Sequence, residues 1–119
     1  MSLKAYKAVQ AATENPRVTE YRLFGQVTGA LLNAKETNAV GGPLVEAVDW
    51  NRRLWRTLAA DCMDDRNSLT EEVRAKIISL SLWVAKYSRS VTREKAPLDP
   101  LIEINRTIMQ GLAPGSDAV

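Results

Sequence analysis

Apolar residues recur three and four positions apart along most of this chain, and Pro or Gly falls between the periodic blocks. This spacing places apolar side chains on one face of a helix, whereas a half-buried strand would alternate them with polar ones. Strand patterns of that kind are almost absent. The sequence therefore predicts an all-helical protein, with helices over about residues 3–13, 16–35, 44–62, 69–93 and 100–112.

Polar residues and prolines mark where several of these helices should begin. Asn15 is expected to cap a helix whose first residue is Pro16, and Asp99 to cap one that starts at Pro100, because a short polar side chain satisfies free backbone N–H groups and proline needs none. Ser68 has the capping-box spacing to an acidic residue three positions on. Short connections between the helices favour antiparallel neighbours.

The fourth predicted helix is the longest, and its apolar surface is wider than one contact face requires. Ile78, Leu82 and Trp83 lie well away from its main apolar line, so apolar groups cover about two thirds of the circumference near its middle. This helix is expected either to be central to a bundle or to be shared with a partner. The main line consists of Val73, Ile77, Leu80, Val84, Tyr87 and Val91.

The expected architecture is a small antiparallel bundle of about five helices with a long central fourth helix. The length of 119 residues suits one domain, since a modest core is possible but two are not. We assign residues 1–112 to a single helical domain and residues 113–119 to a flexible C-terminal tail.

The composition argues against most enzymes, metal sites and cofactors. The chain has no His and a single Cys, Cys62, on an apolar line; it lacks the commonest proton-transfer group and the residues of a zinc cage. A formal charge of +2 gives no strong attraction to nucleic acid or to a membrane. No segment has the length of apolar residues that a bilayer requires, and Lys4 and Lys7 interrupt the N-terminal segment. We expect a cytoplasmic protein that is not an enzyme and holds no metal or cofactor.

The densest group of large side chains is a block of tryptophans and arginines in the third helix: Trp50, Arg52, Arg53, Trp55 and Arg56. Trp and Arg are enriched at protein-binding hot spots, so the block is one candidate recognition surface. An equally weighted alternative places both rings in the core and the arginines in solvent. Stacking and phosphate contact with RNA has less support, because no RNA-binding signature is present.

Two asparagines and two glycines each have an internal and a partner-binding interpretation. Asn51 lies on the apolar line of the third helix and Asn105 beside that of the fifth; an internal role in fixing register is favoured over partner binding. Gly25 and Gly29 share a face of the second helix, where close helix packing is favoured over a groove for a partner. Ile78 and Leu82 are added to the candidate partner-binding residues for their place on the second apolar face.

Four sequence blocks together resemble one known family, the FlaF flagellar biosynthesis regulators. In order and spacing the resemblance runs from about Tyr6 to Leu112, and the stretch Lys35–Pro43 and the tail after Leu112 carry no matching motif. The blocks are Thr19–Gln26, Asp49–Trp55, Ile77–Val84 and Pro100–Arg106.

This resemblance implies a flagellar assembly factor that supports flagellin synthesis and secretion together with the regulator FlbT. It is expected to act as a cytoplasmic chaperone that binds the terminal helical segments of flagellin, because an amphipathic helix can lie in an apolar groove. Two alternatives remain open. The protein acts on flagellin mRNA after transcription, with direct RNA binding less favoured, or it is an adaptor that binds FlbT alone.

Overall fold

A computed structural model describes residues 16–112 and confirms the all-helical fold over that range. The helix expected over residues 3–13, the Asn15 cap and the tail of residues 113–119 lie outside the described residues. The four described helices are α2 (Pro16–Glu36), α3 (Gly41–Met63), α4 (Glu71–Glu94) and α5 (Asp99–Leu112).

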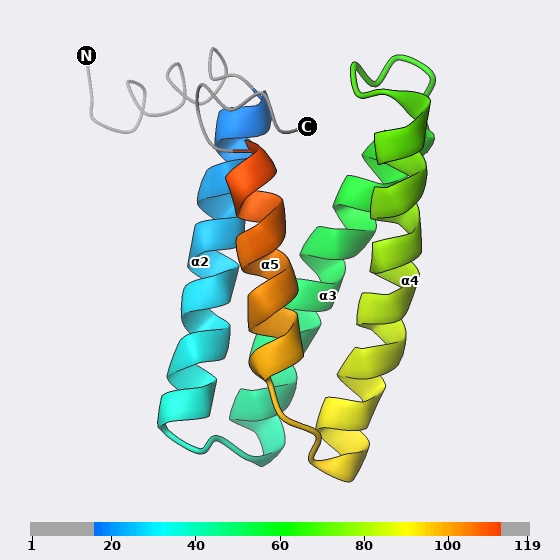
Figure 1. Cartoon of the computed structure of the whole chain (residues 1–119). Helices are drawn as coiled ribbons and strands as arrows, with labels where there is room; N and C mark the ends of the chain where they lie inside the picture. The colour runs from blue at the N-terminus through cyan, green and yellow to red at the C-terminus, as the bar shows by residue number, and fades with distance from the viewer. Residues whose placement is uncertain (1–15, 113–119) are drawn as a thin grey trace, which may run out of the picture.

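Consecutive helices run antiparallel, and α5 returns to lie against α2 (Figure 1). The central helix is α3, which packs against α2 on one side and α4 on the other. The prediction of a central fourth helix is therefore wrong, although α4 is the longest of the described helices. It packs mainly on α3 and makes few contacts with α5. Much of its wide apolar surface is therefore not covered by the other described helices. This favours the second expectation, that the surface contacts a partner.

The helix boundaries follow the predicted signals closely, with three small corrections. Helix α2 begins at Pro16 as expected, whereas α3 begins at Gly41, three residues before its predicted start. The cap of α4 is Thr70, not Ser68, and its hydroxyl oxygen accepts a hydrogen bond from the Val73 backbone N–H at 3.3 Å. Helix α5 begins at Asp99, one residue before the predicted start. All three shifts are within the range over which helix ends are usually uncertain from sequence.

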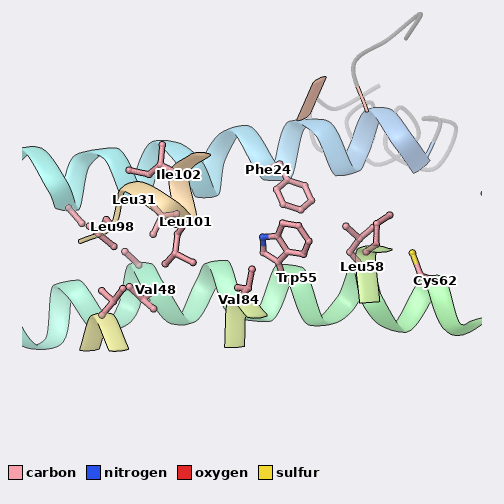
Figure 2. Close-up of a cluster of buried hydrophobic side chains, with 14 residues drawn as sticks. Phe24, Leu31, Val48, Trp55, Leu58, Cys62, Val84, Leu98, Leu101 and Ile102 are labelled. Carbon is pink, nitrogen blue, oxygen red and sulfur yellow. The ribbon is translucent and has the colours of Figure 1, made fainter. Parts of the chain in front are cut away.

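The apolar core lies mainly between α2 and α3 and is completed by α4 and α5. Figure 2 shows the ring of Phe24 from α2 against the indole of Trp55 from α3. Their centroids are 5.5 Å apart in an edge-to-face arrangement, the geometry that the charge distribution of aromatic rings favours. Cys62 is buried nearby, and this burial raises the pKa of its thiol. The cysteine thus acts as a small apolar residue, as expected.

A chain of hydrogen bonds crosses the core and is centred on Asn105 of α5. Its amide oxygen accepts from the Trp55 indole N–H at 2.8 Å. Its amide nitrogen donates to Asn51 of α3 at 2.7 Å and to Thr28 of α2 at 3.1 Å. All four side chains are buried, where an unpaired polar group would be costly, and in this network only the Nδ2 of Asn51 lacks a partner among the described residues. The internal role predicted for the two asparagines is confirmed, because together they join three helices in one arrangement.

Candidate functional site

The tryptophan and arginine block does not form one recognition surface. Trp55 is fully buried between α2, α4 and α5, so its assignment to partner binding is wrong. Trp50 is 38% exposed, but it and Arg52 are about 200° apart around α3, since successive residues turn by about 100°. Trp50 and Arg52 therefore lie on different sides of the helix, whereas Arg53 lies about 60° from Trp50.

The arginines of this block are partly engaged by a neighbouring carboxylate. Arg52 donates to Asp49 at 2.7 Å, and the Nε of Arg53 lies 3.2 Å from the same carboxyl group. The hydrogen bond from Arg52 is the main cause that lowers the pKa of Asp49, so this carboxylate stays ionised. Arg56 is exposed one turn further on. The local charge is therefore less positive than three arginines alone would suggest.

The structure brings Arg52, Arg56, Ile78 and Leu82 together along one side of the α3–α4 pair. They border a hollow of about 360 Å³ whose inner surface consists mostly of small side chains. Two large apolar side chains that line it remain exposed, Leu82 at 70% and Met63 at 63%. The other lining residues are Ala59, Ala60, Ser81 and Ala85.

A second, smaller hollow of about 80 Å³ lies further along the same pair of helices. Arg52 lines both hollows, so we treat them as one feature, the α3–α4 groove. In the smaller hollow the Oγ of Ser88 and the Nε of Arg52 are buried without a hydrogen-bond partner among residues 16–112. The remaining lining residues are Val45, Val48, Asp49, Arg89 and Thr92.

The opposite side of α4 has a separate hollow of about 670 Å³, shared with α5. Trp83 lines it and stacks on Tyr87 with the ring centroids 5.1 Å apart. Burial raises the pKa of Tyr87, whose hydroxyl donates to the backbone oxygen of Pro97 at 2.7 Å. Asp99 and Glu103 give this side an acidic edge. Sequence analysis noted Trp83 as off the main line but did not predict this hollow.

The two glycines of α2 lie on a different part of the molecule. Among residues 16–112, a Cβ atom at Gly25 would meet only the flexible end of Met109, at 3.7 Å, and one at Gly29 would meet nothing within 4 Å. The preferred explanation for these residues, close approach of another helix, is therefore wrong at Gly29. Neither glycine lines the α3–α4 groove. Their assignment to partner binding stays a prediction.

We expect Gly29→Ala to stabilise the protein by about 0.5–1 kcal/mol, because alanine has the higher helix propensity and its methyl group has room. Urea denaturation monitored by circular dichroism measures the change. Gly41→Ala is the matched control: Gly41 has a φ of +63°, which strains an alanine, so this variant should lose stability. A loss of stability in Gly29→Ala would contradict the open surroundings of Gly29.

These observations define a helical-bundle protein whose third and fourth helices present an apolar groove. Among residues 16–112, no helix combines the length and apolar character needed to span a bilayer, and no cluster of side chains suits a metal ion. The family model described as flagellar protein FlaF matches residues 2–112. The chain therefore belongs to the FlaF family of flagellar proteins. No curated protein and no solved structure gives a match.

Proposed function

We propose that this flagellar protein is a cytoplasmic chaperone that binds the terminal helical segments of flagellin and supports its synthesis and secretion together with FlbT. The observation that carries the proposal is the α3–α4 groove, in which Leu82 and Met63 remain exposed on a folded bundle. Membership of the FlaF family supports the flagellar context.

The groove suits an amphipathic helix for a physical reason. Exposed apolar side chains that lie together indicate a surface that another apolar surface covers. Two packed helices leave a furrow between them, and the small residues Ala59 and Ala85 in it permit close approach of a third. Helix α3 has 23 residues, or a length of about 34 Å at 1.5 Å per residue. A partner helix of several turns therefore has a matching surface to lie on.

Direct action on flagellin mRNA has less support from the arrangement of charges. Arg52 and Arg53 both pair with Asp49, so neither is a free cation, and the partly exposed indole of Trp50 lies about 160° from Arg52 around α3. An RNA-binding surface would instead combine free cations with exposed aromatic rings on one face. Binding of FlbT without flagellin, as an adaptor would do, is an alternative outcome of the same experiment.

The test is calorimetric titration of the full chain with monomeric flagellin, and with flagellin that lacks its terminal helical segments. We expect saturable binding to the intact monomer and none to the truncated form, since the helical segments supply the apolar contact. Circular dichroism of the mixed components confirms that both are folded. Absence of binding to intact flagellin would overturn the proposal, and titration with FlbT and with flagellin mRNA would then separate the adaptor from the RNA regulator.

A further inference from the structure

The smaller hollow of the α3–α4 groove contains hydrogen-bond donors that the described residues do not use. Ser88 is only 3% exposed, yet its Oγ has no partner among residues 16–112, and the same holds for the buried Nε of Arg52. Leaving buried polar groups unpaired is unfavourable, and native proteins rarely do so without a ligand or a water molecule. These two groups therefore indicate that something polar enters the hollow.

The charges around the hollow favour an anionic group. Arg52 and Arg89 line it, and Asp49 is its one acidic lining residue. Asp49 accepts from Arg52 Nη2 and lies beside Arg53 Nε, so two guanidinium groups share one carboxylate and the charge around the hollow stays positive. Arg52 Nε, Arg89 and the Ser88 hydroxyl remain as donors. Three residues with donor groups therefore line one small hollow, and several such donors together suit a carboxylate.

The position of the hollow identifies where such a carboxylate comes from. Arg52 lines both this hollow and the apolar one that contains Leu82, so a helix lying along the groove passes over both. A volume of about 80 Å³ has room for one small polar group and not for a helix. The group must therefore project from whatever occupies the apolar part.

We propose that the smaller hollow binds one Asp or Glu side chain of the flagellin helix that occupies the α3–α4 groove. This inference rests on the proposed function and adds the chemistry of the bound segment. The apolar part of the groove supplies most of the contact area. The carboxylate, held by Arg52, Arg89 and Ser88, fixes the position of the partner helix along the groove.

The first experiment compares three single variants by calorimetry with monomeric flagellin. Arg89→Gln should weaken binding by about 10-fold, the low end for a hydrogen bond to a charged group. Ser88→Ala should likewise weaken binding by about 10-fold, because its hydroxyl also donates to the carboxylate, and it should not lose stability, because that hydroxyl has no partner among the described residues. Lys86→Gln is the matched control: it removes one positive charge from the same helix outside the groove and should leave the affinity unchanged.

The second experiment locates the partner residue by replacing each Asp and Glu of the terminal helical segments of flagellin with Asn or Gln. One such replacement should weaken binding to the wild-type protein, yet have little further effect on Arg89→Gln, because both changes remove the same contact. If flagellin binds and none of its acidic residues couples to Arg89, the inference is overturned while the proposed function stands. If wild-type protein does not bind flagellin at all, the proposed function fails and this inference fails with it.

Discussion

Trp55→Ala is expected to lower the free energy of unfolding by about 3–5 kcal/mol, the usual cost of removing a buried aromatic side chain. The ring is fully buried against Phe24. Its loss also leaves the amide oxygen of Asn105 without its indole donor. Because small domains have a net stability of only about 5–15 kcal/mol, the variant should be close to unfolded at 37 °C. Urea denaturation followed by circular dichroism measures the effect.

Trp50→Ala is the control for this prediction. It removes the same type of side chain from a position about 140° around α3 from Trp55, where the ring is partly exposed, and it should cost about 1 kcal/mol or less. Trp55→Phe separates the hydrogen bond from the ring, since it keeps an aromatic group and removes the N–H. Adding Asn105→Leu to that variant tests the coupling of the two residues. Equal losses in the two alanine variants would contradict the assignment of Trp55 to the core.

Leu82→Asp is expected to weaken flagellin binding by about 100-fold or more and to leave the fold intact. Leu82 is 70% exposed in the α3–α4 groove, so the folded protein alone loses little when it is replaced. In the proposed complex, however, the substitution buries a carboxylate against an apolar surface, which is strongly unfavourable. Calorimetric titration with monomeric flagellin measures the change in affinity.

Val40→Asp is a closely matched control, because Val40 is also 70% exposed and receives the same substitution. It lies outside the α3–α4 groove, at the N-cap of α3, where no side chain caps the helix. An aspartate there should support the helix and leave flagellin binding unchanged. If Leu82→Asp binds as tightly as Val40→Asp while both are folded, the groove is not the flagellin site.

Much of the fold was predictable because local signals and tertiary packing agree. Pro16 begins α2 as predicted, and the Gly41–Pro43 segment begins α3. The internal role of Asn51 was also predictable, since a polar residue on an apolar line is usually explained by a buried partner. Its partner Asn105 lies 54 positions away. A single sequence does not state which of several buried amides will meet.

The candidate site was predicted only in part, because residue type does not reveal which side of a helix is covered. Trp55 and Trp50 are equivalent in type, and their separation depends on where α2, α4 and α5 pack around α3. The exposed Leu82 was anticipated from the width of the apolar surface of α4. The contribution of Met63 and of the unpartnered Ser88 to the α3–α4 groove was not anticipated. It depends on which side of α4 packs against α3, and residue type does not reveal this.

The dependence of the core on Asn105 has a consequence for how the chain matures during synthesis. The groups that this residue joins on α2 and α3 are translated well before it, at sequence separations of 77, 54 and 50 positions. In a nascent chain that ends before α5, the Trp55 indole N–H has no Asn105 acceptor, and the side of α2 that packs against α5 is exposed. Contacts this distant in sequence form late, because the intervening loop must close first. Completion of the native bundle therefore waits for release of the last helix from the ribosome, so a prematurely terminated product does not reach the native state.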